Sequence, residues 1–247
     1  ERAASAYVSW KKGGFAAEAA GSTRKKFYPP LWEGQEFHNP NNYGQDTRAY
    51  IDLSYQRPLG ERTSAQGRVF LDRYLFDGDY PYKGEDSSTV MSREFASGLW
   101  WGGELQVNHK FERHQLTAGM DTRFQPLVQL TTYDENPYYY YGGSRTRLHN
   151  TGVFAQDEFS LHRKLKVTTG FRVDQYSTFG RAVNPRLAVV WTPAKKSSFK
   201  LLMGTAFRAP NPYELTYRTA TFIPNGNLRP ERTGSIEGVW EQYWGPH

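Results

Sequence analysis

Apolar and polar side chains alternate with a period of two along most of this 247-residue chain. In residues 165–174, Leu165 and Phe171 fall on one set of alternate positions and Arg172 falls on the other. Because successive side chains of a β-strand point to opposite sides of its sheet, this alternation predicts strands with one apolar and one charged face. About eleven such runs occur, with almost no helical periodicity, so we expect an all-β chain.

The connections between these runs also alternate, in length. We expect short turns near residues 11–14, 58–62, 112–114, 162–164 and 193–196. We expect long polar and aromatic loops near residues 22–47, 75–94, 133–149 and 208–232, with one briefer loop near 177–183. Short turns at one end and long loops at the other are typical of an antiparallel up-and-down transmembrane β-barrel. A Greek-key sandwich has no reason to keep this alternation.

The composition is compatible with such a barrel and excludes several other classes. The mean hydropathy is −0.75, and no apolar run approaches the roughly 20 residues of a membrane-spanning helix. Aromatic residues make up 16% of the chain, which suits strands with one apolar and one wet face. There is no cysteine, so disulfides and thiolate metal sites are excluded. A soluble β-rich protein would share this composition and stays open as an alternative.

No arrangement of residues suggests catalysis, a cofactor or a bound metal. The six histidines show no metal-ligand spacing, and no serine, glutamate or glycine signature marks a catalytic site. The net charge of +6 is spread over turns, loops and strands instead of forming one block. We therefore predict that the protein is not an enzyme, needs no cofactor and has no nucleic-acid partner.

Three segments carry a resemblance to a known family. Residues 207–215 read Phe-Arg-Ala-Pro-Asn-Pro-Tyr-Glu-Leu, and residues 227–231 read Asn-Leu-Arg-Pro-Glu. Upstream, residues 184–191 read Asn-Pro-Arg-Leu-Ala-Val-Val-Trp. Taken together in chain order, the three segments resemble the barrel half of TonB-dependent outer-membrane receptors.

The resemblance implies a fold and a cellular location. Residues 1–247 would form part of a receptor barrel, about half of a barrel of roughly 22 strands. An odd number of strands would leave edges that cannot stand in hydrocarbon, so the chain looks incomplete. Nothing in it resembles the N-terminal plug domain of the family or its TonB box. The expected location is the outer membrane of a Gram-negative cell, among its lipids and lipopolysaccharide.

The resemblance also implies a function, which is TonB-energised uptake of a ferric siderophore or a similar bulky nutrient. The ligand would bind at the outer loops, and the TonB complex would act through the plug domain. In the haem-uptake branch, a histidine between two related boxes ligates the iron, but residues 209–227 contain no histidine. A siderophore or cobalamin is therefore favoured over haem. A passive porin-like barrel remains a second alternative.

For residues 207–215, we favour a structural role as the end of a strand and the clamp of a loop. The prolines stop strand pairing because they lack a backbone N–H, and Arg208 can form a loop-fixing ion pair with Glu214 or Glu231. Direct ligand contact is the other interpretation of this segment. The dense loop tyrosines either form a binding platform or belong to an interfacial aromatic girdle. For Tyr7, Trp10, Trp191 and Trp240, which lie near strand ends, we favour the girdle.

Two sets of residues follow as site candidates. The candidate ligand-binding residues of the outer loops are Tyr80, Tyr82, Tyr138, Tyr139, Tyr140, Tyr141, Arg208, Tyr213, Glu214, Tyr217, Arg218 and Arg229. The candidate residues that face the plug from the barrel lumen are Lys166, Arg172, Asp174, Arg186, Lys200 and Glu237.

Overall fold

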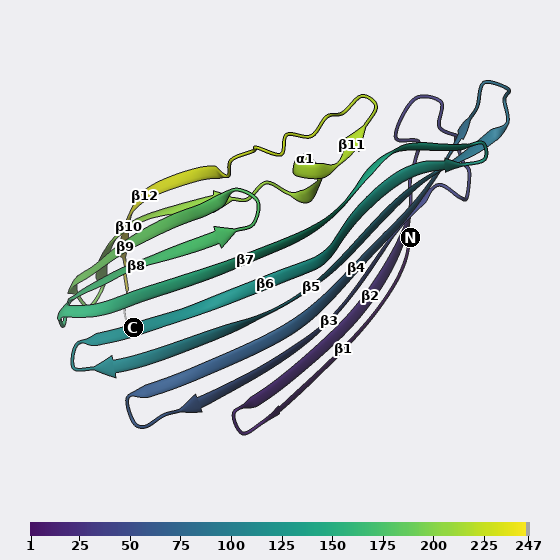
Figure 1. Cartoon of the computed structure of the whole chain (residues 1–247). Coiled ribbons are helices and arrows are strands. Elements are labelled where there is room, and N and C mark those ends of the chain that lie inside the picture. Colours follow the sequence, from purple (N-terminus) through teal and green to yellow (C-terminus); the bar gives the residue numbers. More distant parts are fainter. Residues whose placement is uncertain (246–247) are drawn as a thin grey trace.

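The computed structural model describes residues 1–245, and they form one curved antiparallel sheet (Figure 1). Neighbours in the sheet follow chain order from β1 to β10, and β12 is the last strand of the row, beside β10. These long strands are β1 (Arg2–Lys12), β2 (Phe15–Phe27), β3 (Tyr43–Pro58), β4 (Thr63–Lys83), β5 (Thr89–Phe111), β6 (His114–Glu135), β7 (Tyr138–His162), β8 (Leu165–Tyr176), β9 (Gly180–Ala194), β10 (Ser197–Arg208) and β12 (Glu231–Gln242). The predicted all-β, up-and-down antiparallel architecture is confirmed.

The two sides of the sheet differ as the alternation predicts. In β8, Phe171 is 52% exposed on one side, whereas Asp174 on the other is only 2% exposed. Directly paired residues of neighbouring strands share a face, so the register extends each side across the sheet. We call the two sides the apolar face, which carries Leu53, Val69, Leu105 and Phe171, and the polar face, which carries Arg68, Glu104, Asp121 and Arg172.

Strands β4 to β7 are much longer than a bilayer requires. They have 21 to 25 residues, whereas a tilted strand crosses the hydrocarbon core in roughly 9–11 residues. The surplus lies at the end of the sheet where the long connections are, which we call the long-loop end, and the opposite end is the short-turn end. In Figure 1, these four strands extend well beyond β8 to β10.

This surplus corrects the expectation of long loops near 75–94 and 133–149. Strand β4 continues through Lys83 and pairs with β5 up to Thr89, and β6 continues through Glu135 and pairs with β7 from Tyr138. The polar and aromatic composition of these segments resembles a loop, but both pairs of strands stay paired to the tip, with a register shift between Thr132 and Tyr133 in the β6–β7 pair. Only residues 84–88 and 136–137 connect them.

Two connections at the long-loop end remain irregular, residues 28–42 and 209–230. The second contains the helix α1 (Pro212–Thr216), which the alternation did not predict, and the two-residue strand β11 (Arg218–Thr219), which pairs with β7. Asn211 caps α1 by accepting from the Glu214 backbone N–H, and the Glu214 carboxylate accepts from the Asn211 N–H in return. Within residues 1–245, no helix is long and apolar enough to cross a membrane.

The sheet is open at both sides within the described residues. Strand β1 pairs only with β2, and β12 pairs only with β10. Every residue of β1 is exposed. Each outer edge therefore presents unpaired backbone donors and acceptors, as expected for a segment of a larger closed barrel.

Candidate ligand-binding site

Loop 28–42 is attached to the end of β4 by backbone hydrogen bonds. The Glu36 N–H donates to the Pro81 carbonyl at 2.9 Å, and the Lys83 N–H donates to the Gly34 carbonyl at 3.1 Å. Inside the loop, the Gln35 amide donates to the Asn42 side chain at 2.8 Å, and both residues are buried. The loop is therefore a folded cover on the long-loop end of β4.

A network around Glu36 strengthens this attachment. The Lys83 ammonium lies 2.8 Å from a Glu36 carboxylate oxygen, and the Thr89 hydroxyl donates to the same oxygen. The Asn39 amide donates to the other oxygen at 2.6 Å. These bonds, with that from Lys83 first, lower the pKa of Glu36 from 4.5 to about 2. Glu36 is therefore ionised at neutral pH and links the loop to the β4–β5 hairpin.

Of the candidate tyrosines, Tyr80 is the most enclosed. It is 8% exposed, and its ring stacks on Tyr28 at 6.4 Å and packs against Trp32 at 5.5 Å between centroids. Both partners lie in or beside loop 28–42. Tyr80 therefore supports the loop from below, and its ring is not available at the surface.

Tyr82 and Tyr141 meet at a buried carboxylate. Both hydroxyls donate to Oδ2 of Asp134 at 2.7 Å, and the two hydroxyl oxygens are 3.3 Å apart. Asp134 is 3% exposed, and its other oxygen, Oδ1, is buried and has no hydrogen-bond partner among the described residues. Both tyrosines were predicted from the sequence as ligand-binding residues, whereas Asp134 was not. Its position beside Tyr133 in an aromatic segment was the only signal in the sequence.

A second cluster docks loop 209–230 onto the sheet. Tyr217 is 8% exposed, stacks on Tyr213 at 4.6 Å, and shares a hydrogen bond with the Thr132 hydroxyl of β6 at 2.7 Å. Burial raises the pKa of the Tyr217 hydroxyl. Strand β11 pairs with β7, where Arg218 lies opposite Gly143. A Cβ at Gly142 would lie 1.9 Å from the Arg218 carbonyl oxygen, so β11 can approach only because residue 142 is glycine.

The same loop is fixed at its base by Arg208. The Arg208 guanidinium binds both oxygens of Glu231, with Nη2–Oε1 at 2.6 Å and Nε–Oε2 at 3.0 Å. It also reaches Glu214 Oε1 at 3.3 Å. The expected ion pair is therefore confirmed, and it involves both candidate carboxylates. Glu214 caps α1 at the same time, so one arginine connects β10, α1 and β12.

The remaining outer candidates stay accessible. Tyr138, Tyr139 and Tyr140 are 70%, 54% and 52% exposed at the tip of the β6–β7 hairpin. Arg218 and Arg229 are exposed in loop 209–230, and within residues 1–245 neither side chain forms an ion pair. The structure thus divides the outer candidates into supports (Tyr80, Tyr82, Tyr141, Arg208, Glu214 and Tyr217) and exposed groups (Tyr138, Tyr139, Tyr140, Tyr213, Arg218 and Arg229).

The six lumen candidates lie on the polar face. Arg172 lies 2.7 Å from Asp121 and from Asp174 and joins β8 to β6. Gly152 makes room for this group, because a Cβ there would lie 2.2 Å from the Arg172 Nη2 atom. Lys166 pairs with Glu158 at 3.1 Å, Lys200 pairs with Glu241 at 2.7 Å, and Arg186 donates to Gln156. Glu237 lies opposite Leu202 and is exposed.

The described residues contain no cluster of three or more histidine, aspartate or glutamate side chains suited to a metal ion.

The sequence of the chain matches a known family over almost its full length. The family described as TonB dependent receptor-like, beta-barrel, matches residues 2–246. The chain belongs to this family of TonB-dependent receptors. Barrels of this family are outer-membrane proteins of Gram-negative bacteria, and they act as transport receptors, not as enzymes.

Solved structures of such receptors share the fold. The siderophore receptor PirA from Acinetobacter baumannii has a TM-score of 0.70 at 13% identity, over 98% of this chain and 40% of that one. The copper transporter OprC has a TM-score of 0.70 at 14% identity, over 98% and 42%. A mutant ferric enterobactin receptor, PfeA from Pseudomonas aeruginosa, has a TM-score of 0.54 at 12% identity, over 94% and 47%. This chain thus spans less than half of each of the three proteins, and these identities show the fold alone.

Proposed function

We propose that this chain forms a ligand-facing part of the barrel wall of an outer-membrane receptor for a ferric siderophore. The observation that carries the proposal is the long-loop end, where the tip of the β6–β7 hairpin and the docked loop 209–230 expose tyrosines and two arginines. Phenolic hydroxyls and guanidinium groups suit an anionic, oxygen-rich chelate, because they donate hydrogen bonds and the guanidinium adds charge. PirA and PfeA, which share the fold, are receptors for a siderophore and for ferric enterobactin.

The supports explain how such a surface keeps its shape. Asp134 holds two tyrosine hydroxyls, and Arg208 fixes the base of loop 209–230. Exposed Arg218 and Tyr213 are therefore carried on ordered backbone, which lowers the entropy lost when a ligand is bound. In this proposal Arg218 and Arg229 contact the chelate, and Tyr138, Tyr139 and Tyr140 add stacking and hydroxyl donors.

The polar face suits a movable plug domain inside the barrel. Its charges are largely satisfied within the sheet, as in the Arg172, Asp121 and Asp174 group, so a plug could be held through water instead of a dry core. We propose that the plug contacts Lys166, Arg186, Lys200 and Glu237 in this way. The energy for uptake would reach the plug from the TonB complex of the inner membrane.

The test uses a strain that depends on this receptor, in its full length, for iron. Growth on ferric siderophores as the iron source, with loss of growth when TonB is deleted, is the expected result. Arg218→Ala and Arg229→Ala should weaken chelate binding, whereas Arg181→Ala, in exposed sequence at the start of β9, is the matched control. Uptake that persists without TonB would favour a passive porin. Growth on haem or uptake of copper without siderophore transport would overturn the ligand class.

A soluble β-rich binding protein is the third possibility, and one measurement separates it. A chain that folds to a monomer in buffer without detergent would contradict the membrane location. We expect folding only in detergent or lipid, because the apolar face exposes large side chains such as Leu105, Phe171 and Trp240.

A further inference from the structure

The short-turn end carries a row of positive charge. Each of its five turns has a pair of basic residues in or beside it. We call these residues the basic rim, and they are Lys11, Lys12, Arg57, Arg62, Lys110, Arg113, Arg163, Lys164, Lys195 and Lys196. Only Glu61 and Glu112 are acidic in the same turns. The connections at the long-loop end contain Glu33, Glu36, Glu85, Asp86 and Glu214 but only Arg218 and Arg229, whereas the strand ends beside them also carry Lys25, Lys26 and Lys83.

The charges of the basic rim are not neutralised within residues 1–245. None of its members forms an ion pair there, although the strands directly above hold the pairs of Arg68, Arg172 and Lys200. All but Lys196 are exposed. Lys164 donates to the Pro193 carbonyl at 2.6 Å, which leaves its charge uncompensated. The basic rim is therefore free to attract anions.

A belt of exposed aromatic rings lies next to the basic rim on the apolar face. Phe15 and Tyr55 are 4.2 Å apart between centroids, and Trp191 stacks on Phe199 at 5.3 Å, with Trp240 beyond it. Such belts mark the level of lipid headgroups in outer-membrane barrels. The basic rim would then lie at the headgroups of the leaflet that faces the short turns.

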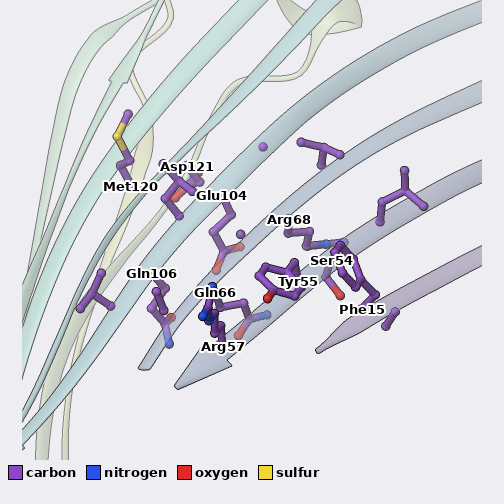
Figure 2. Close-up of a pocket in the computed structure, with 18 of the residues that line it drawn as sticks. Phe15, Ser54, Tyr55, Arg57, Gln66, Arg68, Glu104, Gln106, Met120 and Asp121 are labelled. Carbon is purple, nitrogen blue, oxygen red and sulfur yellow. The ribbon is translucent and has the colours of Figure 1, made fainter. Parts of the chain in front are cut away.

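The apolar face has a groove whose lining includes Arg57 of the basic rim (Figure 2). One row of paired residues crosses it, in the order Phe15, Tyr55, Gly67, Leu105 and Met120, and Lys12 pairs with Phe15 at the end of this row. Gly67 has no side chain, and this leaves a gap in the row between Tyr55 and Leu105. In the next row toward the turn, small Ala65 lies beside Arg57. The groove has a volume of about 920 Å³ and an almost wholly apolar lining.

We propose that this groove, with Arg57 in its lining and Lys12 paired with Phe15 beside it, forms a binding site for an anionic diacyl phospholipid. An acyl chain lies in the gap at Gly67, and the lipid phosphate binds Arg57 and Lys12. This inference rests on the proposed membrane location and adds a specific lipid to it. The groove volume falls within the roughly 300–1,000 Å³ typical of small-molecule sites.

Charge and position together select this occupant. A neutral lipid would fill the groove equally well but would gain little from the basic rim. Each basic residue near an anionic lipid surface contributes about 1 kcal/mol, which corresponds to about fivefold in partitioning. Lipopolysaccharide lies in the other leaflet of an outer membrane, at the long-loop end. The remaining anionic lipid for this groove is a phospholipid of the inner-facing leaflet.

The experiment compares two lipids that differ only in headgroup charge. The full-length receptor is reconstituted in nanodiscs of dioleoyl phosphatidylcholine and dioleoyl phosphatidylglycerol in a 3:1 ratio, transferred to detergent, and its retained lipids are counted by native mass spectrometry. We expect the ratio of phosphatidylglycerol to phosphatidylcholine among the retained lipids to be at least fivefold higher than in the nanodiscs. Raising the salt concentration from 0.05 to 0.5 M should reduce the enrichment, because the contact is partly exposed.

Variants assign the enrichment to the groove. Lys12→Gln and Arg57→Gln should each lower it about fivefold, and Gly67→Val, whose added Cβ meets only the Leu105 side chain at 3.4 Å, should lower total lipid retention. The matched controls are Arg181→Gln at the opposite end and Gly21→Val, which lies on the same face in open space. A heat-modifiability assay on gels confirms that each variant is folded.

Three outcomes are decisive. Equal retention of the two lipids by the wild-type receptor would overturn the inference, as would an enrichment that the Lys12 and Arg57 variants leave unchanged. Insertion into nanodiscs with no lipid preference would leave the membrane location standing. Failure to insert into either lipid would instead overturn the proposed location.

Discussion

Arg208 and Glu231 join the last residue of β10 to the first residue of β12 through two parallel hydrogen bonds of 2.6 and 3.0 Å. The pair closes the base of loop 209–230, which spans 22 residues between the two strands. A planar guanidinium fits a carboxylate in this two-point geometry, whereas an ammonium group meets it at a single point. The shape of the loop therefore depends on an arginine at position 208.

The first prediction concerns the order of this loop. Replacing Arg208 by lysine keeps the charge but loses the second hydrogen bond to Glu231 and the contact with Glu214, so the base of the loop should open more often. We expect trypsin to cleave the folded receptor after Arg218 several-fold faster, as followed by mass spectrometry. Arg181→Lys serves as the control. Unchanged cleavage rates would show that the docking of α1 and β11 holds the loop without this pair.

The second prediction tests the assignment of the two faces. Phe171 is on the apolar face, so Phe171→Arg should lower the free energy of unfolding by about 2 to 4 kcal/mol if the residue is near the bilayer centre. Lys166→Gln changes the polar face and should cost much less. Urea unfolding of the full-length receptor in lipid vesicles measures both values. Equal losses would contradict the assignment of the apolar face to lipid.

The third prediction concerns topology. Lys195 lies in the turn between β9 and β10 at the short-turn end, and Asn225 lies in exposed loop 209–230 at the other end. The described chain has no cysteine, so single substitutions are clean probes. An impermeant maleimide should label Asn225→Cys on intact cells and should label Lys195→Cys only after the outer membrane is permeabilised. The reverse pattern would mean that the barrel is inserted in the opposite direction.

The two faces could be predicted from the sequence because alternation is a local property, and a one-residue shift would move every side chain to the other side. The ends of β4 to β7 could not be predicted in the same way. Tyr80, Pro81 and Tyr82 suggest a loop by composition, yet the ladder from Asp77 to Lys83 pairs without a break with β5. Pairing between strands overrode the local preference of these residues.

The candidate site was predictable in its residue types but not in its contacts. Tyr82 and Asp134 are 52 positions apart, and Thr132 and Tyr217 are 85 positions apart, so no local pattern could associate them. Arg208 was identified because its carboxylate partners occur nearby in the sequence, Glu214 in the same segment and Glu231 in the next one. The sequence therefore indicated which loops carry the site, and the structure distinguishes supporting tyrosines from exposed ones.

The fourth prediction is a pH dependence at loop 28–42. The pKa of Glu36 is lowered from 4.5 to about 2, so the folded loop prefers the ionised carboxylate. Its stabilising effect is fully present above pH 4.5 and is lost as the pH falls through about 2. Hydrogen exchange of the amides in residues 28–42 should therefore rise between pH 4.5 and 2, after correction for intrinsic rates. Glu36→Gln should exchange faster at neutral pH and show little of this dependence. A wild-type profile as flat as that of the variant would contradict the role of Glu36.

The last prediction separates support from ligand contact within loop 209–230. Tyr217→Phe keeps the ring that stacks on Tyr213 and loses the hydrogen bond to Thr132, which should cost about 1 kcal/mol of loop docking. Tyr217→Ala also loses the buried ring and should release β11 from β7. Arg218→Ala leaves docking intact and should weaken siderophore binding by about 1 to 3 kcal/mol if the bound guanidinium is buried. Hydrogen exchange at Gly142 and Gly143 reports docking, and titration with a ferric siderophore reports binding. If Arg218→Ala raised this exchange as much as Tyr217→Ala, Arg218 would be a support of the loop and not a ligand contact.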